Sequence, residues 1–173
     1  MNDAVMFFFK KKFHVVIVCT ANRTRSAYFA GYLNHCIQQY WPGALKRIKI
    51  TSAGTKAVSG GRVNDVVALI ARKQGFSLRQ HLSTPVSTAL MKRADLILVM
   101  EQEHKDYILE NYPFTKEKLF RLMEYGWQGE DSMSSLNVPD PTGKDADDFK
   151  AFIETARVEA DRLINELVHR EVL

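Results

Sequence analysis

The sequence has few cysteines and no residue pattern that requires crosslinks. Cys19 and Cys36 are the two cysteines in 173 residues, and their spacing fits neither a zinc knuckle nor a disulfide scaffold. A chain of this length can bury a sizeable core without such staples, so one compact domain is expected. Reduced thiols are typical of the cytoplasm. The composition therefore predicts a single cytoplasmic domain.

Long apolar runs are also missing near the N-terminus. The patch Met6–Phe9 precedes three lysines, 10–12, and is too short for a transmembrane helix. The order of its charges is wrong for a signal peptide. We expect residues 1–12 to form an irregular arm or an early start to the first strand, residues 13–173 to form the domain, and no stable membrane insertion.

The excess of positive charge is small. The formal net charge is +4 and the pI is near 9.1. We interpret this as a solvated surface, although such a charge can also steer anionic substrates. Basic residues do not alternate with aromatic ones in a stripe, so nucleic acid is not an expected partner. The oligomeric state is left open.

Apolar, β-branched segments alternate with helical patterns along the chain. Strands are expected over 14–18, 48–50, 95–100 and 119–122. Helices are expected after the first strand, after the cap residue Asn64, over 102–111 and near the C-terminus. A loop rich in polar residues runs from Tyr125 to Gly143. This alternation predicts an α/β domain, with a four-stranded parallel sheet covered by helices on both faces.

The most informative segment joins the first strand to the first helix. It reads Cys19-Thr20-Ala21-Asn22-Arg23-Thr24-Arg25-Ser26. A short loop before a helix directs successive N–H groups toward an anion, and the helix dipole adds to their effect. Arg25 can donate two parallel hydrogen bonds to phosphate oxygens. Cys19 in such a positive pocket is favoured as a thiolate, which can attack phosphorus. The segment therefore predicts a phosphate-binding loop.

A Cys and an Arg six positions apart are common by chance, but the surrounding pattern is more specific. Between about Phe13 and the C-terminal helix, the chain resembles the low-molecular-weight protein tyrosine phosphatases. Further matches to that family are Ser52-Ala53-Gly54-Thr55, His81, the block Ala94-Asp95-Leu96-Ile97-Leu98-Val99-Met100, and Asp140-Pro141. The resemblance implies a phosphatase acting on phosphorylated proteins without a metal or organic cofactor.

The same resemblance implies a role for each residue of the motif. Cys19 attacks phosphorus, and Asp140 protonates the leaving oxygen and later activates water. Arg25 and the amides of the loop hold the phosphate oxygens. Ser26 donates to the sulfur of Cys19. The residues expected to bind substrate are Thr20, Ala21, Asn22, Arg23, Thr24 and Ser26.

A polar network is expected to support the loop. Asn22 suits a left-handed backbone position, which asparagine tolerates better than most residues. In the family this asparagine is held by buried polar groups, which correspond to Ser52 and His81 here. His81 could equally be an ordinary structural histidine, Ser52 a turn residue at the end of a strand, and Asp140-Pro141 only a turn.

Three positions differ from the family pattern. Thr24 stands where a second cysteine is usual, so reversible protection of Cys19 through a loop disulfide is not expected. Arg23 replaces an aliphatic or small residue and projects either into the rim or into solvent. The aromatic rings that usually flank the site are missing at Val58 or Ser59 and at Thr142-Gly143, and Trp127 is a candidate substitute.

Three other functions are compatible with parts of this pattern. Arsenate reduction needs further cysteines, and Cys36 lies on the apolar face of a helix. Phosphoarginine hydrolysis is associated with a threonine at the position of Arg23, although Thr24 is nearby. A silent phosphate-binding or phosphoprotein-binding module would need neither the thiol of Cys19 nor the acid Asp140.

Overall fold

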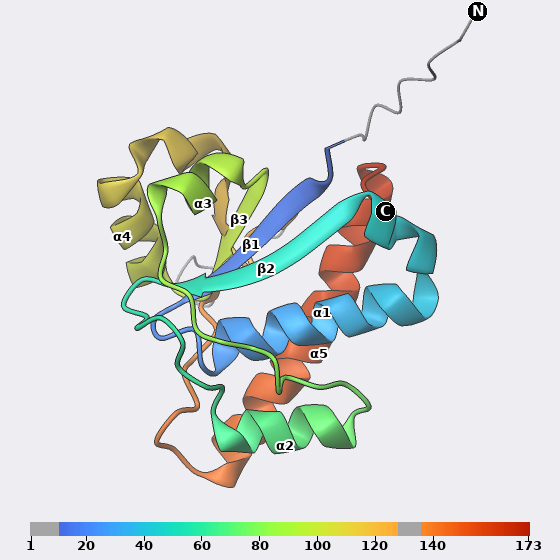
Figure 1. Ribbon diagram of the computed structural model, residues 1–173, viewed down its shortest axis with the longest axis vertical. Helices are drawn as coiled ribbons and strands as arrows, with labels where there is room; N and C mark the ends of the chain where they lie inside the picture. Colours follow the sequence, from blue (N-terminus) through green and yellow to red (C-terminus); the bar gives the residue numbers. More distant parts are fainter. Residues whose placement is uncertain (1–10, 128–135) are drawn as a thin grey trace, which may run out of the picture.

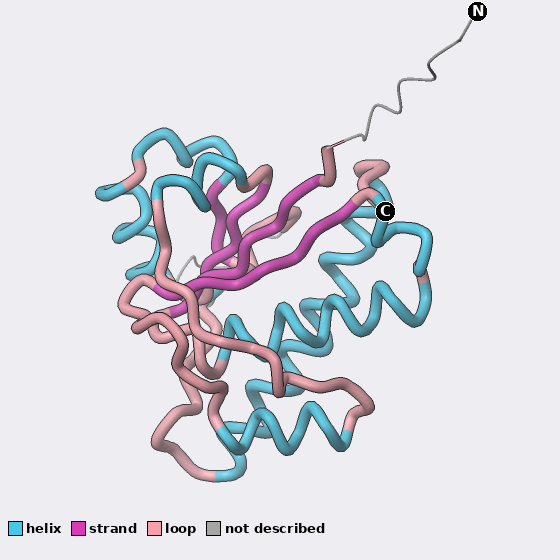
Figure 2. Tube along the Cα trace, in the orientation of Figure 1, coloured by secondary structure: helices cyan, strands magenta, loops and turns pink. Residues whose placement is uncertain are grey.

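Four parallel strands form the centre of the fold (Figures 1 and 2). The computed structural model describes residues 11–127 and 136–173. The strands are β1 (Phe13–Cys19), β2 (Ile48–Gly54), β3 (Leu96–Val99) and β4 (Leu119–Arg121), and their order in the sheet is β2-β1-β3-β4. All three pairings are parallel. The predicted four-stranded parallel sheet is confirmed.

Helices cover both faces of this sheet, as predicted (Figure 1). Side chains alternate between the faces of a strand, so β1 contributes to two cores. Val15 and Ile17 pack in the core that includes α1 and α5, whereas Val16 and Val18 face the core that includes α3 and α4. All four side chains are completely buried, which explains the unbroken apolar run of this strand.

The helices follow the predicted order, with one addition. They are α1 (Arg25–Tyr40), α2 (Asp65–Lys73), α3 (Thr88–Arg93), α4 (Gln102–Asn111) and α5 (Ala146–His169), with short 3₁₀ helices at Pro42–Lys46 and Pro113–Lys118. Asn64 caps α2, as expected, by accepting a hydrogen bond from the N–H of Val66. The six-residue helix α3 was not predicted from the sequence, because its single buried residue, Met91, leaves no amphipathic pattern.

The loop from Thr20 to Thr24 connects the end of β1 to the start of α1. Because β1 has neighbours on both sides, this loop lies at the middle of the carboxyl edge of the sheet, where α/β proteins bind ligands. Residues 1–10 of the N-terminal arm, which was predicted over 1–12, lie outside the described residues. Residues 128–135 of the 125–143 loop also lie outside them. Among the described helices, none has the length and apolarity needed to cross a membrane.

Candidate active site

In and next to the loop after β1, carbonyl oxygens accept hydrogen bonds from neighbouring segments of the chain. The carbonyls of Cys19 and Thr20 accept from the N–H groups of residues 55 and 56, and that of Arg23 accepts from Asn64. The N–H groups of residues 20–24 have no acceptor within the described parts of the chain. This arrangement leaves a ring of amide donors for an anion, as the sequence motif predicts.

The end of β2 lies directly against this loop. A Cβ at Gly54 would stand 2.4 Å from the carbonyl oxygen of Thr20 and 2.9 Å from the nitrogen of Asn22. Real Cβ atoms do not approach backbone this closely, so a residue without a side chain is required at this position. Gly54 thereby allows the strand end to act as a rigid support for the loop.

Asn22 has a left-handed backbone, with φ at 55°, and is fully buried. Its Nδ2 donates to Ser26 Oγ at 2.9 Å and to Ser52 Oγ at 2.8 Å, and its Oδ1 accepts from the N–H of Thr84 at 2.9 Å. His81 Nε2 lies 2.7 Å from the Asn22 carbonyl oxygen. The structure thus brings together Asn22, Ser52 and His81, and adds Thr84, which sequence reasoning missed.

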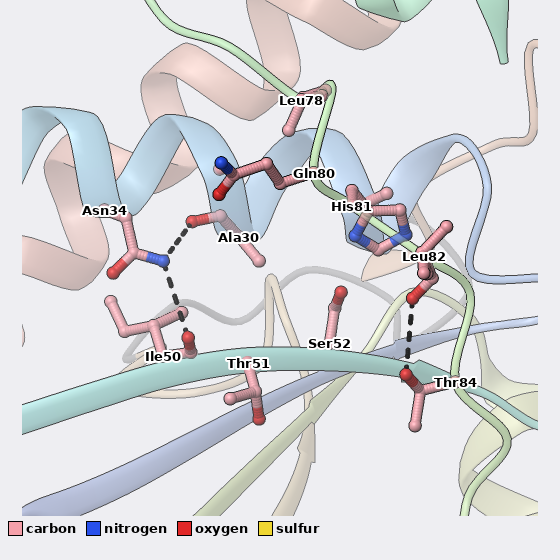
Figure 3. A pocket seen from close by; sticks show the side chains of 12 residues that line it. Ala30, Asn34, Ile50, Thr51, Ser52, Leu78, Gln80, His81, Leu82 and Thr84 are labelled. Carbon is pink, nitrogen blue, oxygen red and sulfur yellow. Dashed lines mark hydrogen bonds between the residues drawn. The ribbon is translucent and has the colours of Figure 1, made fainter. Parts of the chain in front are cut away.

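Beside this network, α1, β2 and the segment 78–84 line an open pocket of about 320 Å³ (Figure 3). Ser52 and His81 both line it, so the two side chains that hold Asn22 face the same space. The network therefore supports the loop at Asn22, and Ser26 links it to the thiol of Cys19.

Cys19 lies at the base of the loop, 3% exposed. Its Sγ is 3.0 Å from Ser26 Oγ, which is close enough for a hydrogen bond. Ser26 also receives the hydrogen bond from Asn22, and its own proton can be given either to the sulfur or to the Ala53 carbonyl oxygen at 3.3 Å. The geometry thus places a hydroxyl donor within reach of the Cys19 sulfur.

Arg25 is buried to 2% exposure and sits between two carboxylates. Its Nη1 lies 2.6 Å from Glu101 Oε2 and donates to the Val138 carbonyl oxygen at 2.9 Å, while its Nη2 lies 2.9 Å from Asp140 Oδ2. Its Nε is buried with no acceptor among the described residues. A buried donor of this kind indicates a place for an anionic ligand.

Asp140 comes to the site from a distant segment of the chain. The N–H of Val138 donates to the Met100 carbonyl oxygen at 2.8 Å, which ties the segment to the end of β3. Asp140 Oδ1 accepts from the N–H of Thr142 at 2.9 Å, and Oδ2 contacts Arg25. Its side chain is 40% exposed, so it can exchange protons with solvent and reach a bound substrate.

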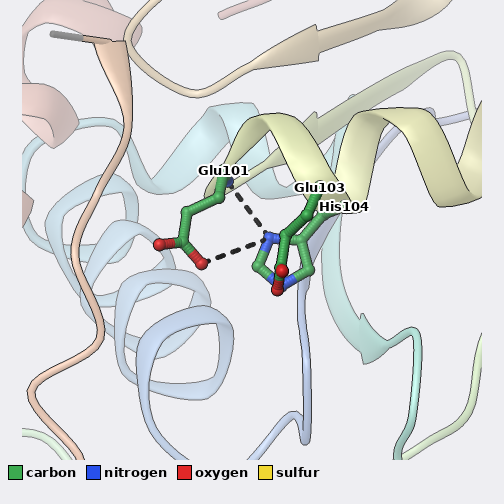
Figure 4. Close-up of side chains that lie close together, drawn as sticks. All are labelled: Glu101, Glu103 and His104. Atoms are coloured by element: carbon green, nitrogen blue, oxygen red, sulfur yellow. Dashed lines mark hydrogen bonds and ion pairs between the residues drawn. The ribbon is translucent and has the colours of Figure 1, made fainter. Parts of the chain in front are cut away.

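Two side chains at the start of α4 belong to the site and were not predicted (Figure 4). Glu101 pairs with Arg25, and its N–H donates to Nδ1 of His104 at 3.1 Å. His104 Nε2 lies 2.8 Å from Thr20 Oγ1. Burial, followed by the positive charge of Arg25, lowers the pKa of His104. This shift favours the neutral histidine, which links α4 to the loop through Thr20.

A cavity of about 260 Å³ opens above Cys19. It is lined by Cys19, Thr20, Ala21, Arg23, Thr24, Arg25, Asn64, Asp140 and Thr142. Arg23 belongs to this rim, where its Nε donates to the Arg62 carbonyl oxygen at 2.7 Å. Val58 and Trp127 are not among the described lining residues, and Trp127 is 42% exposed. On the described part of the chain, the rim carries no aromatic side chain.

Glu101, Glu103 and His104 offer oxygen and nitrogen atoms within 4.8 Å of one another (Figure 4). Glu101 Oε2, however, is 2.6 Å from Arg25, and His104 Nε2 is bonded to Thr20. A cation bound there would compete with Arg25 and Thr20 for these atoms. We therefore assign Glu101 and His104 to the support of the phosphate loop.

A parallel α/β sheet that carries a thiol within an anion-binding loop has the parts that a cysteine-dependent phosphatase requires. The family model of the low molecular weight phosphotyrosine protein phosphatases matches residues 14–172. This chain belongs to that family.

Individual relatives agree with this assignment. A low molecular weight protein-tyrosine-phosphatase of Acinetobacter johnsonii is 32% identical over 145 residues, which cover 82% of this chain and 91% of the relative. The tyrosine phosphatase Wzb from Escherichia coli K30, crystallised with sulphate, is 25% identical with a TM-score of 0.75, covering 90% of this chain and 99% of Wzb. A mutant of the arginine phosphatase YwlE with a phosphorylated active-site serine is 25% identical with a TM-score of 0.79, covering 92% of this chain and 99% of YwlE.

Proposed function

We propose that this chain hydrolyses phosphomonoesters, with phosphotyrosine in proteins as the substrate class, through a phosphocysteine intermediate. The observation that carries the proposal is the placement of Cys19 at the base of a ring of free amide donors, beside Arg25 and Asp140. The names of the tyrosine-phosphatase relatives support the substrate class.

In the first step, the Cys19 thiolate attacks phosphorus and forms the S–P bond while the P–O bond to the leaving group breaks. Asp140 gives its proton to that leaving oxygen. Arg25 and the amides of residues 20–24 hold the three remaining oxygens as charge builds up on them. A bound phosphoryl group takes over the hydrogen bond from Arg25 Nη2, which frees Asp140 Oδ2 to carry the proton.

In the second step, water attacks phosphorus and transfers a proton to Asp140. The S–P bond breaks, inorganic phosphate leaves, and Cys19 returns as a thiolate. The hydrogen bond from Ser26 stabilises the departing sulfur. A covalent phosphate on the active-site residue of the YwlE mutant supports an intermediate of this type.

The first test is hydrolysis of an aryl phosphate at mildly acidic pH in the presence of a metal chelator. We expect wild type to turn over and Asp140→Asn to lose about 10²-fold to 10³-fold in kcat, because general acid catalysis contributes effects of that size. The loss should grow as the leaving group becomes more basic. Asp161→Asn, an exposed aspartate on α5, serves as the control and should match wild type. Phosphate binding without turnover by wild type would favour a binding module instead.

The rim favours substrates without a positive group beside the phosphate. Arg23 is a cation at the mouth of the cavity, whereas phosphoarginine carries its own guanidinium next to the phosphoryl group. We therefore rank phosphotyrosine above phosphoarginine for this chain, even though YwlE shares the fold. Arsenate reduction ranks lower still, because burial raises the pKa of the Cys36 thiol and keeps it protonated.

The two thiols support a cytoplasmic location for the enzyme. Cys19 and Cys36 are both free and buried. Because the proposed mechanism requires a reduced Cys19, we place the protein in the cytoplasm, where thiols stay reduced. Phosphorylated proteins are the proposed partners.

Peroxide is expected to inactivate the wild-type enzyme irreversibly. Thr24, which precedes Arg25, bonds to Thr142 through its hydroxyl and offers no thiol. Cys36 lies on α1 about 16 Å further along the helix axis than Arg25. A sulfenic acid on Cys19 therefore has no resolving partner and is oxidised further.

Activity after peroxide and then dithiothreitol checks this expectation. Wild type and Cys36→Ala should stay inactive, with Cys19 found as sulfinic or sulfonic acid by mass spectrometry. Thr24→Cys should regain most of its activity, since its thiol can condense with the sulfenic acid, release water and form a reducible disulfide. A Cys19–Cys36 disulfide in wild type would contradict the prediction.

A further inference from the structure

The tautomer of His104 is fixed by its neighbours. The ring is 1% exposed, and its Nδ1 accepts the N–H of Glu101 at 3.1 Å. A neutral imidazole carries its proton on the other nitrogen in that case, so Nε2 donates to Thr20 Oγ1 at 2.8 Å. One lone pair of the Thr20 hydroxyl therefore accepts the hydrogen bond from His104.

Arg25 also donates to the same hydroxyl. Its Nη2 lies 3.4 Å from Thr20 Oγ1, a longer contact than that of His104. A hydroxyl has two acceptor lone pairs and one proton to donate. With both lone pairs facing donors, the Thr20 proton must be given to another group, and no acceptor for it exists within the described residues.

The remaining direction for this proton is the cavity above Cys19, which Thr20 lines. We propose that the Thr20 hydroxyl donates a hydrogen bond to the substrate's phosphoryl group, and that His104 is the positioning residue that turns the hydroxyl toward it. This inference rests on the proposed phosphatase function, and it adds a side-chain donor to the ring of loop amides.

The surroundings of His104 favour its neutral form. Burial and Arg25 lower its pKa, whereas Glu101, Glu103 and Asp140 act in the opposite direction with smaller effects. A protonated ring would lose the acceptor for the Glu101 N–H at Nδ1. Neutral His104 is thus the form that the start of α4 and the loop both require.

The test compares Thr20→Val, which keeps the shape, with Thr20→Ser, which keeps the hydroxyl. Thr20→Val should lower kcat/KM about tenfold and weaken inhibition by inorganic phosphate to a similar extent, as expected for one hydrogen bond to a charged group. Thr20→Ser should stay within about threefold of wild type. Should the valine variant fail to fold, Thr20→Ala takes its place.

A second arm tests the role of His104. His104→Leu should lower kcat/KM in the wild-type background and have little further effect in Thr20→Val, because the two residues act through one hydroxyl. Thr51→Val is the matched control. It removes a hydrogen bond of the same kind and length, His14 Nε2 to Thr51 Oγ1 at 2.8 Å, within the sheet. This control should retain full kcat/KM.

Equal losses in Thr20→Val and Thr20→Ser, unchanged phosphate inhibition in Thr20→Val, or additive losses in the double variant would each overturn the inference. Calorimetric titration with inorganic phosphate separates it from the proposed function, since binding needs no turnover. If wild type binds phosphate tenfold more tightly than Thr20→Val but hydrolyses nothing, the inference stands and the phosphatase proposal fails. If wild type binds no phosphate, both fail.

Discussion

Replacing Cys19 by serine is expected to lower kcat by at least about 10⁴-fold while phosphate still binds. A hydroxyl needs a base to become a nucleophile, whereas a thiol in this setting needs only its surrounding donors. Within the described residues, the hydrogen-bond partner of the sulfur is Ser26 Oγ at 3.0 Å, and a serine hydroxyl is not a general base. The loop amides and Arg25 are unaffected by the change, so the anion site remains.

Steady-state hydrolysis and phosphate titration of the same preparation check this prediction. Cys36→Ala is the control, because it removes the other thiol from the core face of α1. It should lose thermal stability but keep its kcat. Activity of Cys19→Ser within a hundredfold of wild type would mean that another group attacks phosphorus.

Replacing Arg25 by lysine is expected to reduce kcat/KM by about 10²-fold to 10³-fold. The guanidinium contacts Glu101 and Asp140 at once and has Nε left for a ligand. A lysine has one nitrogen, which cannot occupy all of these positions together. Phosphate affinity should fall with the rate, because the same donors serve ground state and transition state.

The control for this variant is Arg157→Lys, an exposed arginine of α5 that pairs with Glu154. It should not differ from wild type in kcat/KM or phosphate affinity. An Arg25→Lys enzyme within threefold of wild type would show that the loop amides alone hold the phosphate.

The sheet and the phosphate loop could be predicted from the sequence because both depend on local signals. The buried strand before Cys19 and the helix after Arg25 are each recognisable from a few neighbouring residues. Asn22 could be predicted as well, since its left-handed backbone is tied to its own residue type.

Glu101 and His104 could not be predicted, because their role depends on which strands are neighbours. Glu101 directly follows the block that ends β3, and β3 pairs with β1, so the two strand ends lie at one edge. A charged residue immediately after a buried strand was the available signal. The lack of aromatic rings at the rim was predicted in part. The missing rings were evident from the sequence, but the position of Trp127 outside the cavity depends on tertiary structure.

The contact between Gly54 and the loop has a consequence for how such an enzyme can change over evolution. Any side chain at position 54 would displace the backbone at Thr20 or Asn22, so the anion cradle and the strand end can only change together. The rim is under no such constraint, because Arg23 and Thr142 reach the cavity with their side chains. New substrate preferences can therefore arise at the mouth of the cavity while the phosphate chemistry at its base stays as it is.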